Sequence, residues 1–316
     1  MNARPPIPLV VVGGYLGAGK TTLLNRLLAN AQGRRIAVLV NDFGEINIDA
    51  ALIRARSDDV IQLENGCICC SIGGRLAEAL VAIAAREQRP DLLVIEASGV
   101  SDPQRIAQVG LLDPAFRLNA VLVAVDVTGV HDSLGDPLVG DMVRRQVAGA
   151  SVVVLTKADL AQAEAVAQAA ATAGALAPRA AVLIAQSGEL PLSVFVDAAV
   201  PAARGTATLL SGAGWQRLPD ATHADIRSIA YQTPRSFDKA RLRQALATVP
   251  VRLLRAKGLV RLEADARLHE VHLVGGRIRL RQAGPAESPG SALVFIGAFD
   301  AAAEPAIRAC MEAALA

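Results

Sequence analysis

A glycine-rich segment near the start of the chain constrains the fold more than any other feature of this sequence. Residues 14–21 are Gly-Tyr-Leu-Gly-Ala-Gly-Lys-Thr, which matches the phosphate-binding pattern G-x-x-x-x-G-K-[ST]. An apolar run at 9–12 precedes the segment, and a leucine-rich run that favours a helix follows it. A phosphate cradle needs this order, because main-chain N–H groups and a helix N-terminus must face the anion. The segment therefore predicts a P-loop in a nucleotide-binding α/β domain.

Each residue type in this loop has an expected role. The Lys20 side chain would reach the β and γ phosphates, and the Thr21 hydroxyl would lie on magnesium. The small residues would let the main chain approach the phosphates closely. The predicted nucleotide-binding residues of this segment are Gly14, Gly17, Ala18, Gly19, Lys20, Thr21 and Thr22.

Short aliphatic runs alternate with helical patterns over the first two hundred residues. The runs are apolar without alternation, as in strands that a parallel sheet buries on both faces. This order predicts a doubly wound, mostly parallel sheet with helices. The predicted strands are 9–12, 36–40, 92–95, 120–125, 152–155 and 182–184, and the predicted helices are 21–31, 74–87, 142–148 and 160–173.

The pattern changes towards the C-terminus. Residues 205–224 show little periodicity and are a predicted linker between domains 1–204 and 225–316. Successive strand patterns with two helices predict that the second, smaller domain is α+β. Its predicted strands are 226–233, 251–262, 268–274, 277–281 and 292–296, and its predicted helices are 237–248, capped by Ser236, and 301–315.

A carboxylate follows the third apolar run. Glu96 comes directly after four apolar residues, and a magnesium–nucleotide site needs an acidic group at the end of a neighbouring strand. We therefore expect Glu96 and Thr21 to hold magnesium, and Lys20 and Glu96 to be the catalytic residues. A γ-phosphate-sensing turn would fit at 97–99, before Asp102-Pro103 begins the next helix.

A guanine-reading pattern follows the run at 152–155. Thr156-Lys157-Ala158-Asp159 matches [NT]-K-x-D, with threonine where asparagine is commoner. An aspartate can accept two hydrogen bonds from N1–H and the exocyclic amine of guanine, and adenine offers no such pair of donors. The sequence therefore predicts GTP and GDP as ligands, through Thr156, Lys157 and Asp159. Residues 185–188 are a further candidate to back the base.

Cys67, Cys69 and Cys70 are crowded into four residues, and Cys310 stands alone. Crowded thiolates in a cytosolic protein favour a metal site, and this ligand type suits zinc, cobalt or copper(I). Three cysteines leave a tetrahedral site one ligand short, and open coordination suits a carrier that releases its metal. The candidate fourth ligands are Asp42, Glu45, Glu64 and water.

This cysteine cluster lies between the P-loop and Glu96, where GTPases keep their nucleotide-sensitive switch segments. We therefore expect metal affinity to depend on the nucleotide state. The net charge of +2 is not concentrated in a basic stripe, which argues against nucleic acid as a partner. No apolar run is long enough for a membrane span or a signal peptide, so we expect a cytoplasmic protein.

Together these segments resemble the CobW family of metal-associated GTPases, relatives of HypB and UreG. The similar segments are 14–25, 41–45 (NDFGE), 64–72 (ENGCICCSI), 96–99 with 102–103, 156–159, 251–258 and 293–297. The resemblance implies a P-loop GTPase domain, and a metallochaperone that binds zinc or cobalt at the CxCC site and transfers it to a client metalloprotein. Intrinsic GTP turnover should be slow, because the sequence offers no evident arginine finger.

Other functions fit the same residues. A nucleotide-regulated zinc buffer or sensor would use the same nucleotide-binding and cysteine residues. The resemblance to the CobW family also implies, as an alternative, a GTPase that acts in cobalamin synthesis or nitrile hydratase maturation. A small-molecule kinase would also use Lys20 and Glu96, but it would leave the cysteine cluster without a role. The sequence leaves the physiological metal, the client and the oligomeric state open.

Overall fold

The computed structural model describes residues 4–40, 60–62, 72–196, 216–217, 227–251, 253–263, 265–274, 276–283, 290–297, 299 and 303–316. The chain divides into two compact units, Met1–Pro178 with Val182–Val196 and Arg179–Ala181 with Asp197–Ala316. The predicted boundaries at 204 and 225 fall in a stretch of which only Gln216–Arg217 is described, so these limits stay a prediction.

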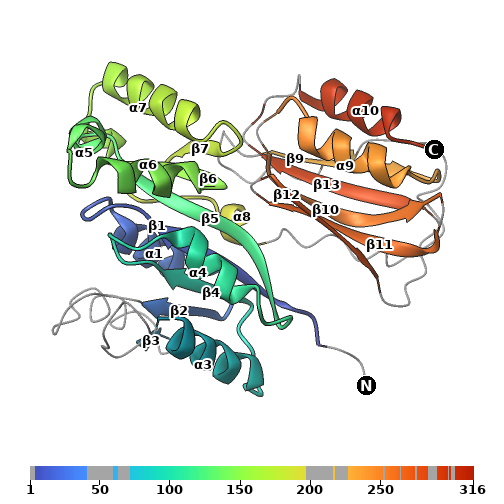
Figure 1. Ribbon diagram of the computed structural model, residues 1–316, viewed down its shortest axis with the longest axis horizontal. Coiled ribbons are helices and arrows are strands. Elements are labelled where there is room, and N and C mark those ends of the chain that lie inside the picture. Colours follow the sequence, from blue (N-terminus) through green and yellow to red (C-terminus); the bar gives the residue numbers. More distant parts are fainter. Residues whose placement is uncertain are drawn as a thin grey trace. The chain divides into compact units, whose positions relative to one another are not determined.

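The first unit is built on a seven-stranded sheet with the order β3-β2-β4-β1-β5-β6-β7 (Figure 1). β1 pairs in parallel with β4 and β5, β2 pairs in parallel with β3 and β4, and β5 pairs in parallel with β6. The strands are β1 (Ile7–Gly13), β2 (Ile36–Val40), β3 (Val60–Gln62), β4 (Leu92–Glu96), β5 (Phe116–Asp126), β6 (Val152–Thr156) and β7 (Ala181–Ile184).

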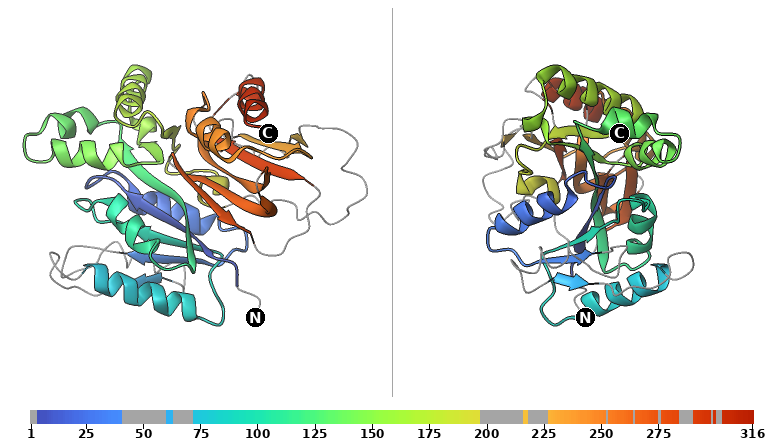
Figure 2. Two further views of the ribbon diagram at one scale, coloured as in Figure 1. Left: turned by 45° about the vertical axis from the view of Figure 1, so that its right-hand side comes forward. Right: turned by 90° about the vertical axis from the view of Figure 1, so that its left-hand side faces the viewer.

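Helices cover both faces of this sheet. The right-hand view of Figure 2 shows α1 on one side of the strands, with α3 and α4 on the other side. The whole of β2, β4 and β6 is therefore buried, which explains why these segments are aliphatic without alternation. The helical segments are α1 (Lys20–Ala29), α3 (Ile72–Ala85), α4 (Pro103–Gly110), α5 (Val130–Gly135), α6 (Gly140–Ala148), the 3-10 turn η1 (Ala158–Leu160), α7 (Ala163–Leu176) and α8 (Leu192–Phe195).

The predicted doubly wound α/β fold is thus confirmed. α4 begins where the sequence predicts, because Asp102 caps it through a bond from Gln104 N to Asp102 Oδ1 of 2.9 Å, and Pro103 occupies its first turn. β5 begins at Phe116, earlier than the predicted residue 120. Among the described residues, no helix has the length and apolar character that crossing a bilayer requires.

The second unit is a six-stranded sheet with the order β12-β11-β10-β13-β9-β8, and two helices pack on it. The β9–β13, β13–β10, β10–β11 and β11–β12 pairs are all antiparallel, as predicted for an α+β domain. Its elements are β8 (Gln216–Arg217), β9 (Arg227–Thr233), α9 (Lys239–Thr248), β10 (Leu253–Leu262), β11 (Asp265–Val274), β12 (Arg277–Gln282), β13 (Ser291–Gly297) and α10 (Ala303–Ala313).

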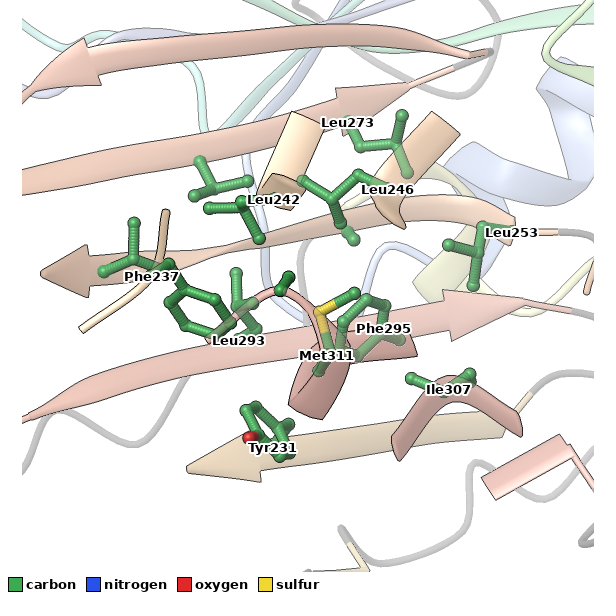
Figure 3. Close-up of a cluster of buried hydrophobic side chains, with 14 of the residues drawn as sticks. Tyr231, Phe237, Leu242, Leu246, Leu253, Leu273, Leu293, Phe295, Ile307 and Met311 are labelled. Carbon is green, nitrogen blue, oxygen red and sulfur yellow. The ribbon is translucent and has the colours of Figure 1, made fainter. Parts of the chain in front are cut away.

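An apolar core joins the helices of this unit to its sheet (Figure 3). Leu242 and Leu246 of α9 and Met311 of α10 meet Leu293 and Phe295 of β13 in this core. Cys310, the free thiol of α10, is partly buried and packs against the same cluster. The second unit therefore has a core of its own.

The predicted cap of the first helix in this unit is wrong. Asp238 rather than Ser236 caps α9, through a bond of 2.7 Å from Arg241 N to Asp238 Oδ1. Phe237 is fully buried, and its N–H donates to Arg261 O (2.8 Å) instead of entering the helix. Because the core holds Phe237 in this extended position, the helix begins two residues later than predicted.

Candidate functional site

The P-loop follows the central strand β1 of the first unit. Gly14, Gly17 and Gly19 all have positive φ angles, of 130°, 74° and 85°. A Cβ on Gly14 would also collide with the carbonyl oxygen of Ala124 in β5, so this position excludes a side chain. The loop thus has the left-handed turns and the close main-chain packing that a phosphate cradle needs.

Lys20 is the first residue of α1, and its side chain folds back over the loop. Its Nζ donates to Gly14 O (3.0 Å) and to Tyr15 O (3.2 Å), and the residue is only 8% exposed. A buried ammonium normally needs such partners, because burying a charge without them is costly. These bonds hold the charge at the mouth of the loop, beside the N-terminus of α1.

The carboxylate predicted for magnesium lies beside the threonine predicted for the same ion. Glu96 ends β4, in register with Val12 of β1 and Val40 of β2, and it is 4% exposed. Thr21 Oγ1 lies 3.5 Å from Glu96 Oε1. A hydroxyl and a carboxylate oxygen are hard ligands of the type that Mg²⁺ takes. These two side chains therefore fit a shared magnesium ion.

Thr156 connects the predicted base-reading segment to the P-loop. Its hydroxyl lies 2.8 Å from Ala18 O and 3.2 Å from Val125 O, and the residue is 4% exposed. The two acceptors belong to the P-loop and to β5, whereas Thr156 ends β6. Thr156, which stands where asparagine is commoner, thus bonds the end of β6 to both the P-loop and β5.

Lys157 makes an ion pair that the sequence analysis missed. Its Nζ lies 2.6 Å from Asp126 Oδ2 at the end of β5. Burial raises the pKa of Asp126, but the hydrogen bonds from Lys157 and Thr128 lower it further, so the net pKa lies below the usual value. Asp126 follows a buried aliphatic run, the same signal that pointed to Glu96. Lys157 has a φ of 56°, in the left-handed region that few non-glycine residues adopt.

The loop after β7 packs against α1, the helix that follows the P-loop. Arg26 Nε of α1 donates to Ser187 O (3.2 Å), and Arg26 Nη1 lies 3.5 Å from Glu189 Oε1. The candidate segment at 185–188 is thus near α1. Thr22 and Asp159 are both exposed, and Asp159 lies in η1 directly after Lys157.

The predicted thiolate site falls outside the described residues. Cys67, Cys69 and Cys70, together with the candidate ligands Asp42, Glu45 and Glu64, all lie within 41–59 and 63–71. Within the parts of the chain that the structure describes, no three His, Cys, Asp or Glu side chains gather into a group that could hold a metal. The metal assignment therefore stays a prediction.

Comparison with known proteins decides the family. A sequence profile described as "CobW/HypB/UreG, nucleotide-binding domain" matches residues 8–184, which is more than half of the chain. This chain belongs to the CobW/HypB/UreG family. A second profile, described as "Cobalamin synthesis protein cobW C-terminal domain", matches residues 226–315. The predicted resemblance to CobW is thus confirmed for both halves of the chain.

Two similar proteins are called zinc chaperone CobW. The protein from Pseudomonas aeruginosa is 35% identical over 228 residues, which cover 62% of this chain and 61% of that protein. The protein from Sinorhizobium sp is 29% identical over 345 residues and covers 97% of each chain. The chain thus spans about three fifths of the first relative and nearly all of the second. The crystal structure of Zn(II)-bound YjiA GTPase from E. coli covers 98% of this chain and 99% of its own chain, with 22% identity and a TM-score of 0.46.

In this CobW-family chain the strand ends bring the predicted nucleotide residues together from distant parts of the sequence. β4, β1, β5 and β6 are consecutive neighbours in the sheet, and they end at Glu96, the P-loop, Asp126 and Thr156. Ligands of open α/β sheets bind outside the carboxyl ends of the strands, where the direction of winding changes. β1 lies at such a position, because β2, β3 and β4 all lie on one side of it and β5, β6 and β7 all lie on the other.

Proposed function

We propose that this protein is a cytoplasmic GTPase that binds zinc, with cobalt as the alternative metal, and transfers it to a client metalloprotein. The observation that carries the GTPase part is the distance of 3.5 Å between the Thr21 hydroxyl and the Glu96 carboxylate at the base of the P-loop. Membership of the CobW/HypB/UreG family and the similarity to two proteins called zinc chaperones support the metal part.

The residues of the P-loop would bind the phosphates of GTP. Main-chain N–H groups of 14–20 and the N-terminus of α1 supply partial positive charge, and Lys20 adds a full charge. Thr21 and Glu96 would hold magnesium, which neutralises charge that develops on the transferred phosphoryl group. Lys20 and Glu96 are thus the proposed catalytic residues. Turnover without a partner should be slow, because no arginine finger is evident.

Guanine would be selected at the end of β6. Asp159 would accept from the two guanine donors, the Lys157 stem would lie along the base, and Thr156 keeps this segment bonded to the P-loop at Ala18 O. The pair of Lys157 with Asp126 fixes the direction of the lysine side chain. Selection by Asp159 is the part of this proposal that distinguishes GTP from ATP.

The metal would bind to Cys67, Cys69 and Cys70, with Asp42 or Glu45 as the proposed fourth ligand. Thiolates suit zinc, and a site with one weak or exchangeable ligand can release its ion. These residues precede Glu96 in the chain and follow the P-loop, so one segment would connect the metal to the magnesium carboxylate. Hydrolysis would then change the affinity for zinc.

The decisive experiment is a competitive zinc titration of the protein with either GDP or a non-hydrolysable GTP analogue bound. We expect the two zinc dissociation constants to differ by about 5- to 150-fold, the range of typical allosteric coupling. Cys69→Ser should weaken zinc binding in both nucleotide states. Cys310→Ser is the matched control, because Cys310 is a free thiol of the second unit and should leave zinc affinity unchanged.

Hydrolysis is tested separately with Lys20→Ala. Removing the ammonium should lower the GTP turnover number by about 100- to 1000-fold, the loss seen when one preorganised stabilising group is removed. Full activity of Lys20→Ala would refute the assignment of the P-loop as the hydrolytic site. Equal zinc affinity of wild type and Cys69→Ser would refute the cysteine site.

A further inference from the structure

A buried glutamine on α6 holds the turn that follows Glu96. Gln146 Nε2 donates to Ser101 O (2.8 Å) and to Gly99 O (3.1 Å). The residue is 2% exposed, although glutamine is normally a surface residue. Gln146 and this turn are separated by more than forty residues in the sequence, so the bonds connect two distant segments.

The orientation of this amide is fixed by its partners. Both partners are carbonyl oxygens, so only the NH₂ end of the side chain can face them. Among the described residues, Gln146 Oε1 has no hydrogen-bond partner. Burying an amide oxygen without a partner costs free energy, which an aliphatic residue at this position would avoid. The bonds to the turn are therefore the feature that requires glutamine here.

The turn that Gln146 holds is itself connected to the nucleotide site. Ala97 N donates to Val12 O (2.8 Å), which continues the pairing of β4 with β1 beyond Glu96. A Cβ on Gly99 would lie 2.8 Å from Leu16 N of the P-loop and within 2.7 Å of the Leu16 side chain. Ser98 Oγ and Ser101 Oγ, 2.8 Å apart, close the turn on itself. A shift of 97–101 would therefore displace the Glu96 end of β4 or the P-loop.

We propose that Gln146 is a positioning residue that fixes the 97–101 turn for the γ-phosphate of GTP. This inference rests on the proposed function, because only a nucleotide with a γ-phosphate would use the turn. Segments that follow the magnesium carboxylate in GTPases are ordered by the γ-phosphate and released on hydrolysis. With Gln146 bonded to Gly99 O and Ser101 O, the turn is held before GTP arrives, which lowers the entropy that binding must remove.

The test compares Gln146→Met with Gln104→Met. Methionine keeps the volume and flexibility of glutamine but removes the donor. Gln104 Nε2 also donates to a main-chain carbonyl beside α6, Gly149 O at 2.9 Å, and among the described residues its side chain makes no hydrogen bond to 97–101. Gln104→Met therefore reproduces the loss of an amide–carbonyl bond at α6 without freeing 97–101. Gln146→Glu is the stronger variant, since a carboxylate of the same shape would face two carbonyl oxygens.

Two measurements are made on the full chain. Hydrogen–deuterium exchange without nucleotide should be at least tenfold faster for the amides of 97–101 in Gln146→Met than in wild type or Gln104→Met. Binding of a non-hydrolysable GTP analogue should weaken by about tenfold in Gln146→Met, whereas GDP affinity should stay within twofold of wild type. Gln146→Glu should show the larger change in both measurements.

Unchanged exchange at 97–101 in Gln146→Met would overturn the inference, and so would an equal loss of affinity for GDP and the GTP analogue. The exchange measurement needs no nucleotide, so it tests the anchoring alone. Hydrolysis of GTP by the wild-type protein tests the proposed function alone. If the wild-type protein failed to hydrolyse GTP but exchange at 97–101 was faster in Gln146→Met, the proposed function would be refuted and the anchoring of the turn by Gln146 would be supported.

Discussion

One hydroxyl group connects the predicted guanine-reading segment to the P-loop. Thr156 lies at the end of β6 with its Oγ1 within hydrogen-bond distance of Ala18 O and Val125 O. β5 lies between β1 and β6 in the sheet, and Gly14 of the P-loop closely approaches Ala124 of β5. The P-loop is therefore close enough to the end of β6 for the Thr156 hydroxyl to reach Ala18 O. Threonine at this position therefore bonds the end of β6 to the P-loop.

Replacing this hydroxyl should affect nucleotide binding more than folding. Thr156→Val keeps the shape of the side chain but leaves Ala18 O without its donor, at a cost of about 1–3 kcal/mol for a buried acceptor. We expect guanine nucleotide affinity to fall by about tenfold, because the P-loop loses a restraint. Fluorescence titration with labelled GDP measures this loss. Thr156→Ser is the matched control and should bind as the wild type does; equal weakening in both variants would assign the effect to packing.

Sequence reasoning finds strand-end residues more readily than it finds their partners. Glu96 and Thr156 follow buried aliphatic runs, and the structure places both beside the P-loop. Asp126 follows such a run as well, but its role depends on Lys157, which no local pattern connects to it. Gln146 lies on a helix where nothing in the sequence distinguishes it from a surface residue. Only the packing of α6 against 97–101 gives it a partner.

At the scale of elements, the P-loop is a turn that tolerates no side chain at its first glycine. Gly14 combines a φ of 130° with the close approach of Ala124 O, so both the backbone and the space exclude alanine. Gly33 has a φ of 75°, but a Cβ there would have no atom within 4 Å. A side chain at Gly33 would therefore cause backbone strain alone, whereas a side chain at Gly14 would cause both backbone strain and a steric collision.

This contrast leads to a paired prediction. Gly33→Ala should lower the free energy of unfolding by about 1–2 kcal/mol, the cost of a left-handed conformation for an L-residue, without changing nucleotide affinity. Gly14→Ala should lower it by more than about 3 kcal/mol, because strain and collision add, and it should abolish GDP binding. Urea denaturation and GDP titration of both variants provide the measurements. Comparable losses in the two variants would mean that the P-loop can relax around a methyl group.

Helix and strand types are predictable from local patterns here, but their ends depend on tertiary packing. The segment predicted as a helix from 237 begins at Lys239, because the core of the second unit takes Phe237 and leaves Asp238 as the cap. The short strand β3 and the helices α5 and α8 have too few residues for a periodic signal. The order of strands in the sheet follows from side-by-side pairing, which no single segment encodes.

At the scale of the whole molecule, the two units have separate cores. Met311 is fully buried among the helices and strands of the second unit, and among the residues whose burial the structure describes, none from the first unit's strands belongs to that cluster. Small domains with their own cores commonly unfold in separate cooperative transitions. We therefore expect damage to one core to leave the ligand site of the other unit largely intact.

A cavity in the second core tests this independence. Met311→Ala should destabilise the second unit by about 2–5 kcal/mol, whereas Met311→Leu, which conserves volume, should cost less than about 1.5 kcal/mol. Differential scanning calorimetry should show one transition moving to lower temperature, while GDP affinity at 25 °C stays at the wild-type value. A parallel loss of GDP binding in Met311→Ala would show that the two units fold as one.

The strand order of the first unit has a mechanical consequence. β4, β1, β5 and β6 are adjacent, and their ends carry the proposed contacts to magnesium, phosphate and guanine. A single nucleotide lying across these ends would connect four neighbouring strands at one rim of the sheet. Its departure would loosen that rim as a whole rather than one contact at a time, so an empty site and a loaded site would differ in stiffness as well as in shape.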